Sequence, residues 1–406
     1  MKLTSSISKR NYSSLLWHAG FLAFATNFID VDTIIPAMMA DAGGTAMHIG
    51  ILTAIMLGGS SFTQLIFAPF ISNFAFKKKF LLTGINSRMF ALLLMGIMLF
   101  YSSKIAGDYE IGFIFLLITI FSVGGAFSNI GYTDILGKSL LENSRKPFFS
   151  IRLVVNGTIL FSSAFLARHL LNSQSYPANY SSMFFVGFIA LSIASLGFWN
   201  IKEVVPSKMQ VKGPNHFFQL IRKELKENKK LFYFLGFINT MGISSTLLPF
   251  MILYAKGNFE GNEMNIGNLL LFKVIGGVLT GLLLFLFSRR FKYRDLLYLN
   301  TALALSAPLL MLLMPSISTL YVVFFLGGIV FASYSITMNG VLLEVTGNTN
   351  RALYTGIAGA GNILPAIFPL LGGWIVQQFG FLPFLLLFMV VVLCSFYFIY
   401  RLHCKK

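Results

Sequence analysis

A long uncharged stretch near the C-terminal end constrains the fold most. From Ala352 to Tyr400 the chain carries no charged side chain. A helix needs about 20 apolar residues to cross the hydrocarbon core of a bilayer, so this stretch is too long for one span. The segment 377–380, Gln-Gln-Phe-Gly, interrupts it and is followed by Pro383. This pattern predicts a turn between two membrane helices.

Apolar stretches of spanning length recur along all 406 residues. Hydrophobic residues make up 56% of the chain and charged residues 11%, whereas a soluble domain carries about 25% charged residues. Because this apolar surface needs lipid to cover it, we predict an all-α membrane protein. Its twelve transmembrane helices would form two pseudo-symmetric six-helix bundles. The predicted helices are 13–36, 47–69, 80–102, 110–133, 148–170, 180–200, 231–254, 264–287, 295–314, 317–343, 353–376 and 381–401.

The polar segment from Ile201 to Lys230 divides the chain into two apolar halves. It holds eight Lys and Arg and three Glu. We predict an N-terminal bundle over 1–200, a cytoplasmic linker over 201–230 and a C-terminal bundle over 231–406. The start of the chain could imitate a signal peptide, but it has no convincing small-residue cleavage site, so we expect an uncleaved first span.

Positive charge is distributed unevenly between the loops. With both termini in the cytoplasm, most of the 31 Lys and Arg fall on the inner side, as the positive-inside rule requires. We therefore expect a multi-pass protein of the cell (inner) membrane with both termini cytoplasmic. The outer loops would keep Lys104, Arg168 and Lys256.

The two halves also share short matches at corresponding spans. Met-His-Ile-Gly at 47–50 opens the second span, and Met-Asn-Ile-Gly at 264–267 opens the eighth. Two further pairs have the same spacing, Arg145 with Asn156 and Arg351 with Asn362. Together these matches indicate a parallel six-plus-six duplication.

With these features the chain resembles the major facilitator superfamily (MFS) of secondary transporters. The resemblance rests on twelve spans, a long central loop and a basic turn after spans two and eight. The family's signature turn reads roughly G-x-x-x-D-x-x-G-R-K. The matching positions here are Pro69, Asn73, Phe76, Lys77 and Lys78, so the basic pair is kept and the glycines and the aspartate are replaced. The resemblance implies the MFS fold and transport by alternating access.

Two acids in the first span are candidate proton-binding groups. Asn27 and Asp30 are three residues apart and would share one helix face, whereas Asp32 would point elsewhere. Partial desolvation favours the neutral form of a carboxyl group, so Asp30 could bind and release a proton. The alternative is a hydrated acid at the outer mouth. We predict a transport or proton site formed by Asp30, Asn27 and Asp32.

Three further residues are candidates for a substrate cavity, namely Lys273, Asn156 and Asn362. Lys273 is a positive charge near the middle of span eight. It could attract an anionic substrate, pair with Asp30 or reach outward to the interface. Asn156 and Asn362 could line a central cavity or form hydrogen bonds between helices.

Charged residues near the inner ends of spans predict a cytoplasmic gate. Asp134 and Arg152 lie at the inner ends of spans four and five, and Arg88 lies two turns into span three. The alternatives are interfacial anchors and, for Arg88, a side chain that extends to the cytoplasm. Glycine pairs such as Gly276-Gly277 would let helices approach closely, although glycine is common in membrane helices.

The residues favour transport over other functions. The net charge of +17 comes in short clusters without a polar domain, which argues against nucleic-acid binding. No phosphate-binding loop, paired metal spacing or catalytic set is present, so we expect no cofactor, no metal and no enzyme. We predict a secondary active transporter, or permease, that is proton-coupled and moves a small solute. Its other partner would be membrane lipid, and it would be a monomer.

Two other functions stay open at the level of sequence. One is a non-transporting membrane sensor or scaffold with the same fold. The other is a membrane-embedded enzyme acting on lipid, which would lack a recognisable nucleophile and base. The substrate could be a sugar, drug, amino acid, nucleoside or organic anion.

Overall fold

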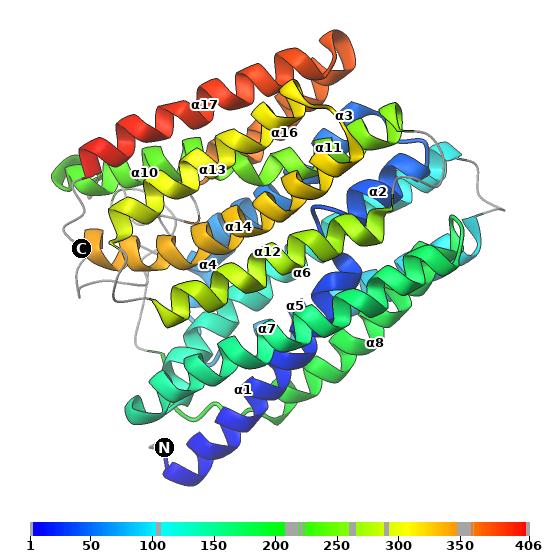
Figure 1. Cartoon of the computed structure of the whole chain (residues 1–406). Helices are drawn as coiled ribbons and strands as arrows, with labels where there is room; N and C mark the ends of the chain where they lie inside the picture. The colour runs from blue at the N-terminus through cyan, green and yellow to red at the C-terminus, as the bar shows by residue number, and fades with distance from the viewer. Residues whose placement is uncertain are drawn as a thin grey trace. The chain divides into compact units, whose positions relative to one another are not determined.

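The structure is a computed structural model that describes residues 3–102, 107–207, 219, 222–223, 225–259, 265–287, 292–346, 359 and 361–402. The regular elements of these residues are all helical (Figure 1). Most of the predicted linker, the start of the eleventh predicted span, and Arg351 lie outside the described residues.

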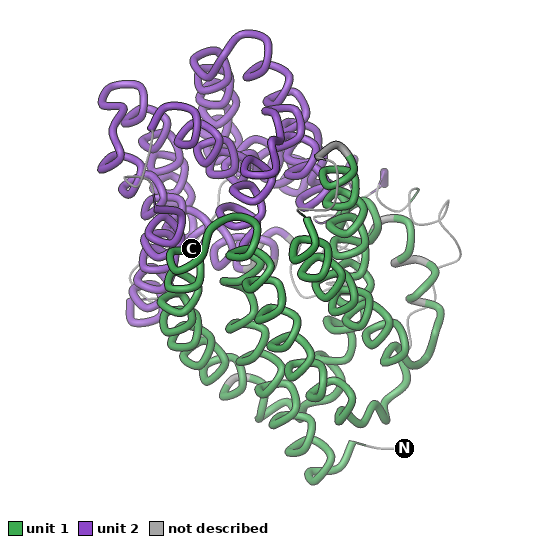
Figure 2. The backbone as a smooth tube through the Cα atoms, turned by 90° about the vertical axis from the view of Figure 1, so that its right-hand side faces the viewer, with its two compact units in different colours: residues 1–29, 59–219 green, residues 30–58, 220–406 purple. Residues whose placement is uncertain are grey.

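The chain separates into two compact units (Figure 2). Unit 1 is Met1–Ile29 with Gly59–Gln219, and unit 2 is Asp30–Gly58 with Leu220–Lys406. Two of the boundaries between the units, after Ile29 and after Gly58, thus fall within the first two predicted spans. The predicted division at 201–230 stays a prediction.

Unit 1 contains six α-helices and a short 3₁₀ turn, η1, at Asn27–Ile29 within its described residues. The helices are α1 (Ser5–Thr26), α4 (Ser60–Ser72), α5 (Lys78–Phe100), α6 (Gly107–Ser139), α7 (Glu142–Ser173) and α8 (Ala178–Asn200). Helix α5 packs against α6 and α8, and α1 packs against α7 and α8.

Unit 2 contains nine α-helices and a 3₁₀ turn, η4, at Ile243–Thr246 within its described residues. The helices are α2 (Ile34–Asp41), α3 (Ala46–Ala54), α10 (Lys229–Gly242), α11 (Leu247–Asn258), α12 (Ile266–Leu286), α13 (Tyr293–Leu313), α14 (Ile317–Thr346), α16 (Ile363–Phe379) and α17 (Phe381–Leu402). Helices α2 and α3 pack against α11, and α3 also packs against α16.

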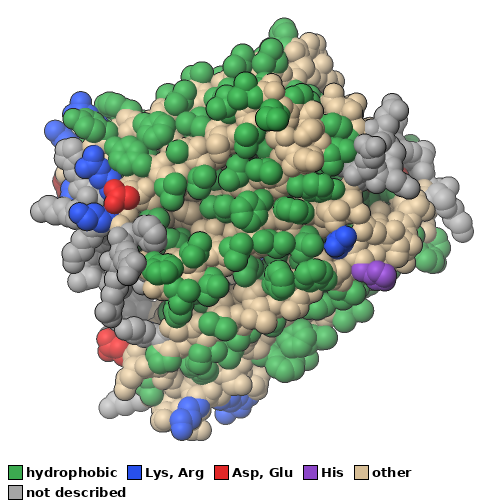
Figure 3. All heavy atoms as spheres, in the orientation of Figure 1, with side chains coloured by type: hydrophobic (Ala, Val, Ile, Leu, Met, Phe, Trp, Pro, Cys, Tyr) green, Lys and Arg blue, Asp and Glu red, His purple; other side chains and the backbone are tan. Residues whose placement is uncertain are grey.

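Eleven helical segments among the described residues are long and apolar enough to cross a membrane. Helix α16, Ile363–Phe379, is apolar but shorter, so the total of twelve spans stays a prediction. Large hydrophobic side chains such as Phe62, Phe100 and Leu313 are exposed, and Figure 3 shows hydrophobic side chains spread over one face of the molecule. This surface needs lipid, and the chain is a multi-pass integral membrane protein.

The first three elements correct the predicted helix boundaries. The span predicted at 13–36 is not continuous, because α1 ends at Thr26 and α2 begins only at Ile34. The span predicted at 47–69 is divided by a π-helical turn, η2, at Ile55–Gly59. A π turn inserts an extra residue into the hydrogen-bond ladder, and such turns are frequent at functional sites. Hydropathy averaged over a span of about 20 residues does not reveal such breaks, although Asn27, Asp30 and Asp32 make the first of them polar.

Glycines allow α12 and α14 to approach until their backbones touch. A Cβ atom at Gly328 would overlap the carbonyl oxygen of Lys273, and one at Gly276 would overlap the carbonyl oxygen of Phe325. Only glycine fits at these two contacts without separating the helices. The approach fixes the section of α12 that carries Lys273.

Candidate functional site

The helix is interrupted between α1 and α2, and Asp30, Asp32 and Thr33 of this polar segment are buried in unit 2. Oδ1 of Asp30 accepts hydrogen bonds from the backbone N–H of Asp32, at 3.0 Å, and from the hydroxyl of Thr33, at 2.8 Å. An aspartate that bonds to the backbone two residues later forms a local turn in place of a helix. Asp30 therefore stabilises the turn and keeps its second carboxylate oxygen free for another partner.

That partner is Lys273 of α12. Its ammonium lies 2.6 Å from Oδ2 of Asp30 and 2.5 Å from Oδ2 of Asp32. All three side chains are about 90% buried, with 8% to 10% of each exposed. The structure thus contains the pair of Asp30 with Lys273 that was one of the sequence alternatives.

The expected orientation of Asp32 was wrong. The prediction placed Asp32 on a different face from Asp30 because it assumed one continuous helix. Since the helix stops at Thr26, the period of 3.6 residues does not apply, and both carboxylates reach Lys273. We call Asp30, Asp32 and Lys273 the buried triad.

The buried triad carries an uncompensated charge. Two carboxylates and one ammonium leave one negative charge when both acids are ionised. Burying a charge is costly unless it is paired, so uptake of one proton would neutralise the cluster. Asp32 also lines a cavity of about 30 Å³ in unit 2, together with Ser244, Ser245 and Tyr334. This space fits about one water molecule and is too small for an organic solute.

A larger cavity lies in unit 1. Its volume is about 280 Å³, and Arg88, Arg152, Asn156, His18 and Tyr132 are among the residues that line it. With its amide group oriented to satisfy both partners, the nitrogen of Asn156 donates to the carbonyl oxygens of Ala19 (3.1 Å) and Arg152 (3.3 Å). Arg88 and Arg152 thus line the same cavity of unit 1.

Asn27 has different neighbours from Asp30. Its amide nitrogen donates to the carbonyl oxygen of Leu160, at 2.6 Å, and to the hydroxyl of Ser163, at 2.8 Å, both in α7. Asn27 and Asp30 therefore share no hydrogen-bond partner within the described part of the chain. Asn362 lies just before α16 in unit 2, where its Oδ1 is buried and makes no hydrogen bond within the described part of the chain.

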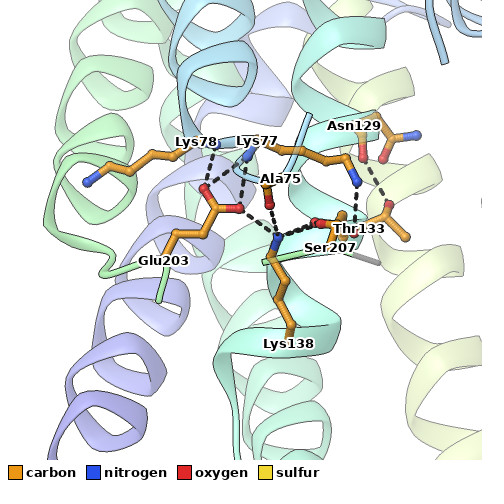
Figure 4. Close-up of polar contacts among 9 residues, drawn as sticks. Ala75, Lys77, Lys78, Asn129, Thr133, Lys138, Glu203 and Ser207 are labelled. Carbon is orange, nitrogen blue, oxygen red and sulfur yellow. Dashed lines mark hydrogen bonds and ion pairs between the residues drawn. The ribbon is translucent and has the colours of Figure 1, made fainter. Parts of the chain in front are cut away.

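Asp134 lies in an ion-pair cluster in unit 1, of which Lys77 and Lys138 are labelled in Figure 4. Its carboxylate is 3.1 Å from the ammonium of Lys77 and 2.6 Å from that of Lys138. The ammonium of Lys138 is also 2.7 Å from Glu203. Arg152 is not part of this cluster, and its guanidinium instead lies over the ring of Tyr132, 5.7 Å from its centroid. The structure thus does not bring Asp134 and Arg152 together.

Glu203 links the start of the central polar segment to the turn before α5. Its carboxylate accepts hydrogen bonds from the backbone N–H groups of Lys77, at 2.8 and 3.0 Å, and of Lys78, at 2.8 Å. In Figure 4 the side chain of Glu203 points toward both of these residues and toward Lys138. Four residues later, the hydroxyl of Ser207 donates to Asp134 over 2.8 Å. Within unit 1 the ammonium of Lys77 thus pairs with an acid, whereas that of Lys78 donates to the carbonyl oxygens of Trp199 and Ile201.

A second group of polar contacts joins the ends of α2 and α3 to the rest of unit 2. Asp41 forms an ion pair with Lys256 of α11. The hydroxyl of Thr45 donates to the side-chain oxygen of Gln377 in α16 over 3.4 Å. We call these two contacts the α2–α3 clasp. Sequence reasoning missed the clasp, because nothing in the sequence links residues more than 200 positions apart.

The sequence analysis also did not predict the contacts that His18 and Glu203 make. His18 lies at hydrogen-bond distance, 3.1 Å, from the carbonyl oxygen of Ala194 and stacks on Phe198 with 3.5 Å between the ring centroids. A polar residue inside an apolar span was the available signal for His18. For Glu203 no signal separated it from the other charges of the central segment.

Comparison with known proteins agrees with this architecture. The family model described as Major Facilitator Superfamily matches residues 233–403. No curated protein sequence matches the chain.

Solved transporter structures share the fold over nearly the whole length. A mutant of the nucleoside transporter NupG aligns with a TM-score of 0.70 at 13% identity, covering 98% of this chain and 100% of that one. A POT family transporter in complex with a thioalcohol-conjugated peptide aligns with a TM-score of 0.70 at 11% identity, covering 97% of each chain. The peptide transporter POT in complex with sulfate aligns with a TM-score of 0.69 at 10% identity, covering 97% of this chain and 95% of that one. The family match over residues 233–403 and the shared fold confirm the resemblance of this chain to the Major Facilitator Superfamily of transporters.

Proposed function

We propose that this chain is a secondary active transporter that moves a small solute by alternating access and couples the movement to protons. The observation that carries the proposal is the buried triad, where one ammonium faces two carboxylates. A buried cluster with one excess negative charge has a reason to take up a proton. A purely structural ion pair would need only one acid.

The triad also lies where a proton could change the packing of helices. Lys273 belongs to α12, whose backbone touches α14, while both acids belong to the segment between α1 and α2. When one acid is protonated, its attraction to Lys273 weakens. We propose that this weakening lets the segment from Asp30 to Gly58 separate from α12 during the transport cycle.

The α2–α3 clasp supports the same cycle. We propose that Asp41 with Lys256 and Thr45 with Gln377 close the extracellular side of the carrier. These contacts are few and polar, so they can break and re-form at small cost. Opening to the outside would then require the clasp and the triad contacts to break together.

The proposed architecture follows the sequence prediction. Twelve spans would form two six-helix bundles over 1–200 and 231–406, joined by a cytoplasmic linker over 201–230. Both termini would face the cytoplasm of a cell whose inner membrane holds the protein, and the protein would act as a monomer. Helix α16 would form part of the eleventh predicted span, 353–376.

Transport by purified protein tests this proposal. Proteoliposomes loaded with a pH-sensitive dye would be exposed to a panel of labelled sugars, amino acids, nucleosides and organic anions, with an inward pH gradient or none. We expect at least one solute to accumulate above its external concentration only with the gradient, and to drive proton entry. A sensor or scaffold would move no solute and no proton. Accumulation driven by a sodium gradient alone would remove proton coupling from the proposal.

A further inference from the structure

The unit 1 cavity has an unusual charge balance. Two guanidinium groups, those of Arg88 and Arg152, line it, and its described lining contains no Asp or Glu. Among the residues that the structure describes, neither arginine forms an ion pair. Two positive charges inside membrane helices without a counter-ion are costly.

We propose that this cavity binds an anionic solute through Arg88 and Arg152, so that the transported substrate is a small organic anion. This inference names the substrate class of the transporter proposed above and rests on that function. Guanidinium groups bind carboxylate and phosphate oxygens through paired, charge-assisted hydrogen bonds. Such an anion would supply the negative charge that the cavity lacks.

Hydrogen-bonding groups of the cavity also lack partners. Among the residues that the structure describes, the buried Nε of Arg88 has no hydrogen-bond partner, and neither does the hydroxyl of Ser128. Buried polar groups are normally satisfied, so orphaned donors in a cavity indicate a missing acceptor. An anion with several oxygens provides acceptors for both side chains.

Aromatic rings hold the two guanidinium groups in place. That of Arg88 lies 4.1 Å from the centroid of the Phe121 ring, and that of Arg152 lies 5.7 Å from the centroid of the Tyr132 ring. Stacking of this kind restrains a side chain without neutralising its charge. The arginines are thus ordered before an anion arrives, which lowers the entropic cost of binding.

Size and charge together separate this cavity from the buried triad. Its volume of about 280 Å³ suits a small solute, whereas the space beside Asp32 measures about 30 Å³. Lys273 was the sequence candidate for attracting an anion, but its charge is already met by two carboxylates. The anion-binding role therefore falls to Arg88 and Arg152, and the triad is left to the proton.

Binding measurements on the purified full chain in nanodiscs test the inference. The probes are glutarate, its neutral isostere glutaramide, and inorganic phosphate, each at millimolar concentration and constant ionic strength, with melting temperature and calorimetry as readouts. The variants are Arg88→Gln and Arg152→Gln. The control variant is Arg294→Gln, because Arg294 is an exposed arginine that contacts Tyr298 in unit 2.

We expect glutarate to bind and glutaramide not to bind. Each cavity variant should weaken glutarate binding by about tenfold or more, the effect of one charge-assisted hydrogen-bonded contact, and Arg294→Gln should leave it unchanged. Arg88→Lys should fold like the wild type and bind at an intermediate level, because it keeps the charge and loses the paired geometry. Binding of phosphate but not glutarate would assign the cavity to phosphate-bearing anions.

Three results would overturn the inference. These are equal binding of glutarate and glutaramide, unchanged binding in both cavity variants, and no saturable effect of either anion on the wild type. The proposed transport function would survive if a neutral solute accumulated in proteoliposomes. It would fail separately if anions bound and no solute moved.

Discussion

The ammonium of Lys273 lies 2.6 Å from a carboxylate oxygen of Asp30, although 243 residues separate the two in the chain. The contact joins the break after the first helix to the middle of α12. Asp32 shares the same ammonium, so two carboxylates face one positive charge. In the proposed cycle the triad is both a structural contact and the place where protonation changes the packing.

Loss of the ammonium should destabilise the protein strongly. Lys273→Met leaves two buried carboxylates without a counter-ion, which costs about 3–5 kcal/mol for a buried pair. We expect a clearly lower melting temperature in detergent or nanodiscs. Adding Asp30→Asn to Lys273→Met should recover part of the loss, because one of the stranded charges disappears. A double-mutant cycle measures this coupling, and strictly additive effects would contradict the ion pair.

Backbone contact between α12 and α14 should make Gly328 intolerant of any side chain. Gly328→Ala forces a methyl group against the carbonyl oxygen of Lys273, and overpacking of this kind costs about 1–3 kcal/mol. Gly281→Ala is the control, since a Cβ atom at Gly281, on the partner helix α12, meets open space. Thermal unfolding should show a lower melting temperature for Gly328→Ala only. Equal melting temperatures would mean that the helices do not touch as described.

Cross-linking the α2–α3 clasp should stop transport. In a background with Cys394 and Cys404 replaced by Ser, Thr45→Cys and Gln377→Cys would be joined by a short bis-methanethiosulfonate reagent, whose disulfide links are cleaved by reduction. We expect solute uptake to fall to background and to return after reduction, because the proposed cycle must break this contact. Each single cysteine variant treated with the same reagent is the control. Full uptake by completely cross-linked protein would exclude the clasp as a moving contact.

Removal of Glu203 should loosen the start of the central segment. Glu203→Gln keeps the side chain's shape, but it loses the charge that meets Lys138 and one of the two oxygens that accept from the N–H groups of Lys77 and Lys78. We expect limited proteolysis after residue 203 to become faster. Glu142→Gln, at an exposed glutamate in the first turn of α7, is the control. Unchanged cleavage rates would show that Glu203 does not anchor this segment.

Hydropathy alone predicted an all-helical membrane protein and most of its helices. A span of about 20 apolar residues is a strong signal because the lipid admits few alternatives. The gap between Thr26 and Ile34 escaped this reasoning, because its polar residues Asp30 and Asp32 were assigned to one continuous helix, whereas Asp30 closes a local turn. The boundary errors therefore fall where side-chain hydrogen bonds compete with the helix.

The candidate residues were found more readily than their partners. Asp30, Lys273, Arg88 and Arg152 attracted notice because charges are rare within spans. Their groupings depend on which helices pack together, and a single sequence does not contain that information. Arg88 and Arg152 illustrate this limit, because they were assigned to a gate with Asp134, whereas the structure pairs Asp134 with Lys77 and Lys138.

Proton-driven accumulation by Asp30→Asn and Asp32→Asn proteins tests the coupling claim most directly. Asparagine keeps the shape of each acid, but it cannot bind or release a proton, and either change leaves the triad neutral. In proteoliposomes with an inward pH gradient, we predict that both variants lose accumulation and keep solute exchange. Asp295→Asn, at an exposed acid of α13, should accumulate solute like the wild type. Accumulation at the wild-type level by both triad variants would contradict proton coupling through Asp30 and Asp32.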